Sequence, residues 1–283
     1  IASLQVNAAT DRPANEKIWS TRDARWLTLA EWRAKSVQAG DVVVLGEQHA
    51  VGDTPSERVH HANQLRLLEE ISNHLPVSLG MEFFDYQKQD IIDQYAAGKI
   101  TEEEFLRLSG WGGNSFPLYR GQILFPPAHG AKTWGLNIPR TISSKVSRGL
   151  ALTPDEADLL PPLWERGGAE YFERFSETMK GHVSDQKIEA YFMAQSLWDD
   201  TMAWRVSKAH PAGAPGVFVV IVGEFHVEFG HGLPARLVRH GVGQIKTMVQ
   251  SEVESWSEEA LTEAVANDTK YGARADYIWV YSL

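Results

Sequence analysis

Cysteine is absent from this chain of 283 residues. Disulfide bonds and thiolate metal ligands are therefore excluded. The lack of cysteine does not distinguish an oxidising from a reducing compartment. Basic residues are in the minority, since 27 Lys and Arg against 37 Asp and Glu give a formal net charge of -10. We do not expect a nucleic-acid partner, because the chain has no basic surplus to neutralise phosphates. Long apolar runs are also missing, and none approaches the ~20 residues needed to span a bilayer.

Two common catalytic motifs are missing as well, namely a glycine-rich loop that cradles phosphates and a G-x-S-x-G nucleophile turn. The rest of the composition, with 43% hydrophobic and 23% charged residues, is ordinary for a globular protein. The length suits one large α/β domain or a domain with a sizeable insertion. Ten Trp and eight Tyr are compatible with a binding surface for a flat apolar ligand, although packing is the commoner use of aromatic residues.

A four-residue phrase, G-E-x-H, occurs twice, at residues 46–49 and 223–226. Each copy directly follows an apolar run, 42–45 in the first case and 217–222 in the second. Such runs predict buried parallel strands, and the glycine that follows predicts a sharp turn off the strand. A third run ends in Gly-Met-Glu at Glu82. Ligands of open α/β sheets bind beyond the carboxyl ends of the strands, so we expect these side chains to form one site.

Histidine and glutamate side chains in this pattern favour acid–base or metal chemistry. A single His after a strand is more often structural, but two in equivalent positions, His49 and His226, favour a functional role. Neutral imidazole is a common metal ligand and the usual general base near neutral pH. Glu47 and Glu82 add carboxylates that complete a His/Glu site for a divalent metal such as zinc, with an open position for water. For Glu224 the turn backbone and Arg236 both stay open as partners.

Strands and helices alternate along the chain, which predicts an α/β fold with a mostly parallel central sheet, helices on both faces and a helical insertion. We expect a single domain over residues 1–283. Its α/β core would comprise about 41–85, 131–150 and 217–283, with helical and aromatic insertions at about 86–130 and 151–210. Residues 1–20 are predicted to be a loose lead-in. The segment 110–130, rich in Gly, Pro and aromatics, is predicted to be a long functional loop.

Tyr119 and Arg120 lie in that predicted loop. A tyrosinate can ligate haem iron, and an adjacent Arg can stabilise the phenolate or contact a propionate. The alternative is a partly buried Tyr whose hydroxyl bonds to a backbone carbonyl. On the long helix predicted at about 185–209, five residues at i, i+4, i+7 spacing predict core packing: Tyr191, Gln195, Trp198, Met202 and Arg205. Asp199 and Asp200 on that helix reach at most the edge of the site.

Several motifs together resemble the ChaN-like haem-binding uptake proteins. They occur in the expected order between about residues 41 and 240, namely at 45–49, 80–85, 95–98, 136–140, 194–203, 222–226 and 232–234. The resemblance implies haem bound at a homodimer interface through a Tyr ligand, with a His nearby. We select Tyr119, with Arg120 beside it, because it follows the loop after Trp111. A non-catalytic haem-binding protein of bacterial iron uptake is the favoured function.

The wider superfamily, which includes Tiki-type metalloproteases, TraB-like proteins and erythromycin esterases, implies an alternative. In those enzymes a G-x-x-H, a downstream Glu and a second G-x-x-H form the active centre, and these map onto His49, Glu82 and His226, with Glu47 as an extra acid. A metal-dependent or His/Glu-driven hydrolase of peptides or esters therefore stays open. The second G-E-x-H phrase, G-E-F-H at residues 223–226, is more acidic than is usual in the haem-binding branch. This departure favours keeping the hydrolase as an alternative function.

The resemblance also implies export, as a periplasmic or outer-membrane lipoprotein. The sequence opens on Ile1 rather than Met, which is compatible with removal of a signal or lipoprotein peptide or with a simple truncation. Any contact with a membrane would then depend on a lipid anchor that is absent from this chain.

Overall fold

The computed structural model describes residues 11–162 and 164–283. Its strands form one eight-stranded sheet in the order β2-β1-β8-β7-β3-β6-β4-β5. Neighbours from β8 to β5 are parallel, whereas β1 pairs antiparallel with β8 and with β2. The strands are β1 Asn15–Ser20, β2 Arg25–Leu27, β3 Val42–Glu47, β4 Val77–Asp85, β5 Thr133–Asn137, β6 Val217–Gly223, β7 Ile245–Glu252 and β8 Tyr277–Ser282. The predicted mostly parallel α/β sheet is confirmed.

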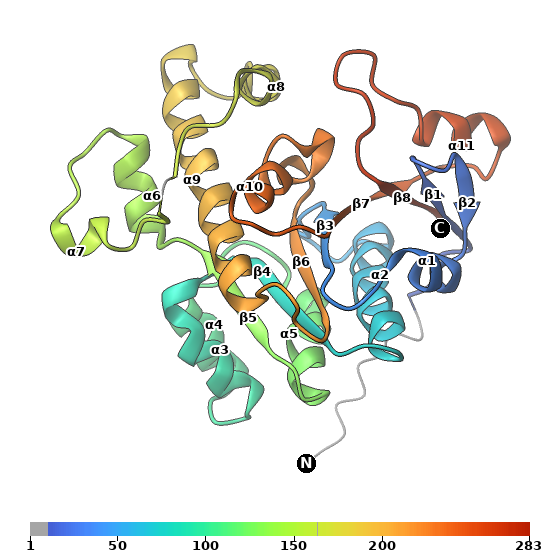
Figure 1. Ribbon diagram of the computed structural model, residues 1–283, viewed down its shortest axis with the longest axis horizontal. Helices are drawn as coiled ribbons and strands as arrows, with labels where there is room; N and C mark the ends of the chain where they lie inside the picture. The colour runs from blue at the N-terminus through green and yellow to red at the C-terminus, as the bar shows by residue number, and fades with distance from the viewer. Residues whose placement is uncertain (1–10, 163) are drawn as a thin grey trace.

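Helices cover both faces of this sheet (Figure 1). They are α1 Leu29–Ser36, α2 Pro55–Ser72, α3 Gln89–Ala96, α4 Glu102–Ser109, α5 Phe116–Ala128, α6 Arg140–Ser147, α7 Pro154–Ala157, α8 Ala169–Met179, α9 Asp185–Ala209, α10 Leu233–Arg239 and α11 Glu258–Ala264, with short 3₁₀ turns η1 Tyr86–Lys88, η2 Glu224–His226 and η3 Glu228–Gly230. In the described residues no helix is both long enough and apolar enough to cross a membrane.

Alternate residues of each central strand supply the two cores. Val43 and Leu45 of β3 pack on the face covered by α2 and α5, while Val42 and Val44 pack on the face covered by α9 and α10. All four side chains are fully buried. Strands buried on both faces are apolar at every position, which is why the sequence shows continuous Val-rich runs rather than alternation. The helices α6 and α8 pack against α9, and in Figure 1 α6 and α7 lie to the left of the sheet.

Four helices begin with the same reciprocal cap, in which a Thr hydroxyl accepts the backbone N–H of a Glu three residues on and that Glu accepts the Thr N–H. The pairs are Thr28 and Glu31, Thr54 and Glu57, Thr101 and Glu104, and Thr153 and Glu156. These caps satisfy backbone donors that a helix leaves unpaired, so local sequence alone places the start of α1, α2, α4 and α7.

The loose structure predicted for residues 15–20 and the loop predicted for residues 110–130 were both wrong. Residues 15–20 are not a loose lead-in but form β1, because they pair along their whole length with β8. The segment 110–130 is not mainly a loop, since α5 occupies most of it. Pro117 lies in the first turn, where the missing N–H costs nothing. Pro126 and Pro127 lie inside the helix in its last turn, where each removes a backbone donor.

Gly46 does not turn the chain off β3, which continues through Glu47. A Cβ at Gly46 would lie 3.0 Å from the Glu224 Cα and 3.1 Å from a Val249 methyl. The glycine is therefore required for the close approach of the two G-E-x-H phrases. At the second phrase, a Cβ on Gly223 would lie 3.1 Å from the His49 ring, so this glycine leaves room for the imidazole.

Candidate functional site

The carboxyl ends of three neighbouring strands, β3, β6 and β4, hold the four residues that the sequence singled out. Glu47 ends β3 and His49 follows it, Glu82 lies on β4, and His226 lies in η2 directly after β6. All four line one pocket of about 360 Å³, which we call the strand-end pocket. Phe175 and Met179 of α8 and Gln195 and Trp198 of α9 line its other side. The structure therefore brings the predicted residues together, as parallel strand topology requires.

His49 is held by a buried carboxylate. Its Nδ1 lies 2.9 Å from Glu47 Oε1, and Glu47 is 1% exposed whereas the His49 side chain is 40% exposed. Glu47 also accepts the Gln64 amide at 2.6 Å and the Tyr119 hydroxyl at 2.9 Å. Burial lowers the pKa of His49, but the bond to Glu47 and the charge of Glu82 outweigh this and raise it above 6.5. Because Nδ1 is engaged, Nε2 is the ring nitrogen available to a ligand.

His226 is fixed as a cation between two carboxylates. Its Nδ1 lies 2.7 Å from Asp199 Oδ1, and its Nε2 lies 3.4 Å from Glu82 Oε1. Burial lowers the pKa of His226, but Asp199 and Glu82 outweigh it and raise the pKa to about 10. Conversely, burial raises the pKa of Glu82, but His226 outweighs this and lowers it to about 2. At neutral pH the site therefore holds a carboxylate, an imidazolium and a second, titratable imidazole.

Asp199 has a larger role in the site than the sequence analysis predicted, since it was expected to reach at most the edge. It is fully buried on α9, where Oδ1 holds His226 and Oδ2 accepts the Tyr171 hydroxyl at 2.9 Å. Gln195, one turn earlier on the same face, donates to Tyr171 at 3.0 Å. The i, i+4 spacing of Gln195 and Asp199 is the signal that places both on one face. Nothing in the sequence indicates that this face meets η2.

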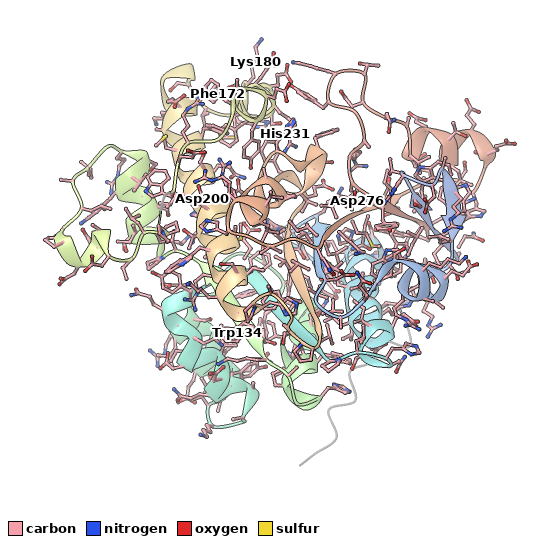
Figure 2. The ribbon with its side chains drawn as sticks, in the orientation of Figure 1. Trp134, Phe172, Lys180, Asp200, His231 and Asp276 are labelled. Carbon is pink, nitrogen blue, oxygen red and sulfur yellow. The ribbon has the colours of Figure 1, made fainter. Side chains whose placement is uncertain are left out.

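Asp200, the next residue, points away from the pocket toward α10 (Figure 2). Its carboxylate lies 3.3 Å from Arg236 Nε and 3.3 Å from His240 Nε2. Arg236 is therefore the partner of Asp200 and not of Glu224. Glu224 instead lies 3.4 Å from the Gln48 amide and 3.6 Å from Arg274.

Tyr119 and Arg120 were predicted to contact haem, and the structure gives that prediction no support. Tyr119 is fully buried, and its hydroxyl donates to Glu47 and accepts the Ala50 N–H at 3.1 Å. Burial and the Glu47 charge raise the pKa of Tyr119 well above its ordinary value of 10, so the phenol stays protonated. Arg120 forms a two-point ion pair with Glu102 at 2.6 Å. Tyr119 thus positions Glu47 from below the strand-end pocket.

The predicted divalent-metal site at His49, Glu82, His226 and Glu47 also gains no support. In the described residues, no group of three or more His, Cys, Asp or Glu side chains is arranged to hold a metal ion. The four side chains are instead engaged with one another and with Asp199, Gln64 and Tyr119.

Comparison with known proteins places the chain in a family. The model of the family described as haem-binding uptake, Tiki superfamily, ChaN matches residues 33–237, which is more than half of the chain. The chain belongs to this family. The resemblance drawn from the sequence motifs is therefore confirmed, and the match includes all four residues of the strand-end pocket that the sequence predicted.

A solved structure described as cofacial haem binding to ChaN of Campylobacter jejuni superposes with a TM-score of 0.68 at 15% identity, over 95% of this chain and 97% of that one. At this identity the likeness shows a shared fold. A curated relative, RETICULATA-RELATED 5, chloroplastic, from Arabidopsis thaliana, is 28% identical over 218 residues. That match covers 70% of this chain but only 29% of the relative, so the chain spans about three-tenths of that protein.

Proposed function

We propose that this chain binds haem in an uptake system. The family match over residues 33–237 is the observation that carries the proposal. The ChaN fold supports it, since the Campylobacter protein with that fold is described as binding haem cofacially. Haem groups that face each other suit a homodimer, so a dimer of this chain is part of the proposal. Export to the periplasm or outer membrane is a further part, which fractionation of cells making the native protein tests.

The strand-end pocket does not fit haem. Haem carries two propionate groups, whereas Glu47, Glu82 and Glu224 line this pocket against one fixed imidazolium, His226. Like charges at close range repel, and a partly desolvated pocket strengthens that repulsion. The residues that fit a dicarboxylate lie elsewhere, in a hollow between α6 and α9 that carries exposed arginines.

Haemin titration tests the proposal. We expect purified protein to bind haemin at micromolar concentration with a shifted Soret band, and sedimentation with and without haemin to report whether the dimer forms on binding. The blanks are buffer alone and a non-haem α/β protein. A spectrum identical to free haemin throughout the titration would remove the haem proposal.

A second candidate function, hydrolysis of an ester or peptide in the strand-end pocket, is favoured by one observation. His49 Nδ1 is fixed on buried Glu47 while Nε2 is free to accept a proton. Water would give a proton to Nε2 as its oxygen bonds to the substrate carbonyl carbon. That proton would then pass to the leaving oxygen or nitrogen as its bond to carbon breaks. The pairing of an oriented base with a fixed cation is the arrangement that such acyl transfer uses.

For this candidate we expect His49→Gln to abolish turnover of a panel of p-nitrophenyl esters and fluorogenic peptides, a loss of at least about 100-fold for a general base. Only neutral His49 accepts the proton, so turnover should fall as the pH decreases through a pKa above 6.5. Gln48→Ala, one residue away on the exposed loop, serves as the matched control. Equal rates in His49→Gln and wild type, or no turnover of any substrate, would exclude hydrolysis by this pocket.

A further inference from the structure

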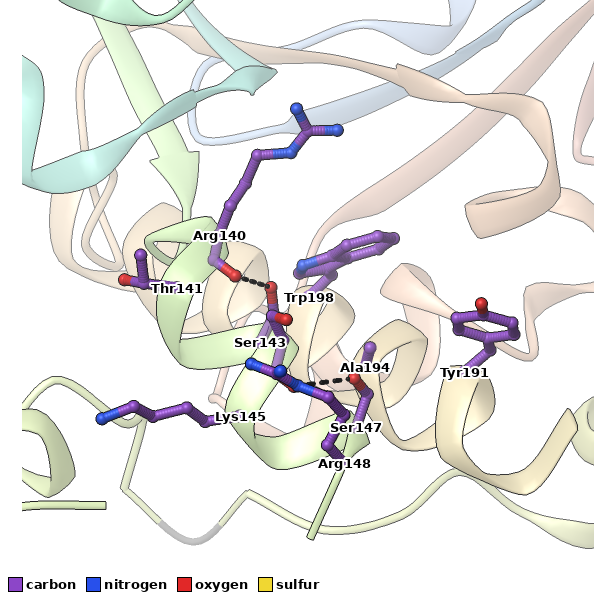
Figure 3. Close-up of a pocket in the computed structure, with 10 residues that line it drawn as sticks. Arg140, Thr141, Ser143, Lys145, Ser147, Arg148, Tyr191, Ala194 and Trp198 are labelled. Carbon is purple, nitrogen blue, oxygen red and sulfur yellow. Dashed lines mark hydrogen bonds between the residues drawn. The ribbon is translucent and has the colours of Figure 1, made fainter. Parts of the chain in front are cut away.

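A hollow of about 590 Å³ lies between α6 and α9 (Figure 3). We call it the α6–α9 hollow. Arg140, Lys145 and Arg148 come from the α6 segment, and Tyr191, Ala194 and Trp198 come from α9. The three α9 residues are spaced i, i+3, i+7, so they follow one another along a single face of the helix. Trp198 lines the strand-end pocket as well, so the same indole separates the two cavities.

The charge of this hollow is opposite to that of the molecule. Most arginines in the described residues pair with carboxylates, as Arg120 does with Glu102 and Arg166 with Glu189. Neither Arg140 nor Arg148 forms an ion pair in the described part of the chain, and both are exposed. Arg148 donates only from Nε, to the Ser144 carbonyl at 3.0 Å.

Lys145 is not available in the same way, because Glu156 holds its Nζ at 2.5 and 2.7 Å. Two unpaired guanidinium groups on a protein with a net charge of -10 form a local site for an acidic ligand. Guanidinium matches the two oxygens of a carboxylate better than any other side chain does. In Figure 3, Arg140 and Arg148 leave α6 in different directions, so they suit a ligand with two separate carboxylates.

Tyr191 differs from the other aromatic residues of the described chain in its exposure to solvent. Its side chain is 41% exposed, and it makes no hydrogen bond, ion pair or ring contact within the described residues. The core packing predicted for the stripe on this helix therefore holds for Met202 but is wrong for Tyr191, while buried Gln195 lines the strand-end pocket. The phenol oxygen is free to bind a ligand, unlike that of Tyr119. Ala194 leaves space between Tyr191 and Trp198, about 10 Å apart along the helix axis.

We propose that the α6–α9 hollow is the haem surface of this chain, with Tyr191 as the iron ligand, Trp198 against the porphyrin ring, and Arg140 and Arg148 on the propionates. The assignment rests on the proposed haem function. Tyr191 would hold ferric iron through its phenol oxygen and would release its proton to solvent on binding, because a metal ligand must be deprotonated. Indole and guanidinium supply the stacking and charge that hold a flat dianionic ring.

Titration with two porphyrins, haemin and iron-free protoporphyrin IX, separates the role of the iron ligand from that of the arginines. Each titration is followed by absorbance and by quenching of tryptophan fluorescence. For Tyr191→Phe we expect loss of the tyrosinate-type haemin spectrum and at least about tenfold weaker haemin binding, with protoporphyrin IX affinity within about twofold of wild type. For Arg140→Gln and Arg148→Gln we expect both porphyrins to bind about tenfold more weakly, because each loses one charge-assisted bond.

Matched controls are Tyr119→Phe and Arg107→Gln, an exposed arginine on α4. Both should leave the haemin spectrum and affinity unchanged. Circular dichroism and thermal unfolding check that every variant folds. If wild type binds haemin but Tyr191→Phe keeps the native spectrum, or Tyr119→Phe loses it, the location is wrong while haem binding stands. If wild type binds no haemin, the proposed function fails and this assignment fails with it.

Discussion

Replacing Glu47 by alanine is expected to lower the free energy of unfolding by about 3–5 kcal/mol, the usual cost of removing one partner from a buried charged network. The Glu47 carboxylate is 1% exposed and accepts from Gln64 and Tyr119. Its loss would leave both groups buried without an acceptor, and each such group costs about 1–3 kcal/mol. Urea unfolding followed by circular dichroism measures the change.

Glu224→Ala is the matched control, because Glu224 occupies the same place in the second G-E-x-H phrase. Its side chain is 26% exposed and its ion pair with Arg274 is 3.6 Å long, so we expect a loss below about 1 kcal/mol. Glu47→Ala should also lower the pKa of His49, since the bond to Glu47 raises it. NMR titration of the imidazole measures that shift. Equal destabilisation by the two variants would contradict the importance given to Glu47.

The second large effect is a loss of stability in alkaline solution. Folding raises the pKa of His226 from 6.5 to about 10, so the folded state favours the protonated ring. The resulting stabilisation is complete below pH 6.5 and disappears as the pH rises toward 10. In that pH window the linkage between protonation and folding should lower the free energy of unfolding by about 1.4 kcal/mol for each pH unit. Folding lowers the pKa of Glu82 from 4.5 to about 2, so its contribution is complete above pH 4.5 and is lost in more acidic solution.

Unfolding free energies measured between pH 5.5 and pH 9.5 test this expectation. Wild type should be most stable between about pH 4.5 and 6.5, where both contributions are complete, and should then lose stability steadily. His226→Gln removes the titrating group, so its stability should depend far less on pH above 6.5. Parallel pH profiles for the two proteins would show that His226 is not a buried imidazolium.

The positions of His49, Glu82 and His226 could be predicted from the sequence because one general rule determines them. Apolar runs of β-branched residues become adjacent parallel strands, and their carboxyl ends share one edge of the sheet. Short-range signals also sufficed for helix starts such as Thr101 and Glu104. Both kinds of inference depend on residues that are close in the sequence or on a topology that has few alternatives.

The partners of those residues could not be predicted, because they depend on how helices pack. Asp199 reaches His226 only because α9 crosses the sheet at one particular rotation, and Tyr119 reaches Glu47 only because α5 covers the opposite face. A stripe at i, i+4, i+7 identifies one face of a helix, but it does not show which other element packs against that face. Tyr191 illustrates this, since it lies on the stripe and is nevertheless 41% exposed.

The position of β8 has a consequence for how the molecule is made. Strand β8 lies between β1 and β7, and Ile18 of β1 pairs with Trp279 of β8. During synthesis the β1–β2 hairpin has no place in the sheet until β8 emerges from the ribosome, and the open edge of β7 stays unpaired for as long. An unpaired edge of this kind invites association with other chains. Substitutions that weaken β8 should therefore reduce the yield of soluble protein more than they reduce the stability of the molecules that complete folding.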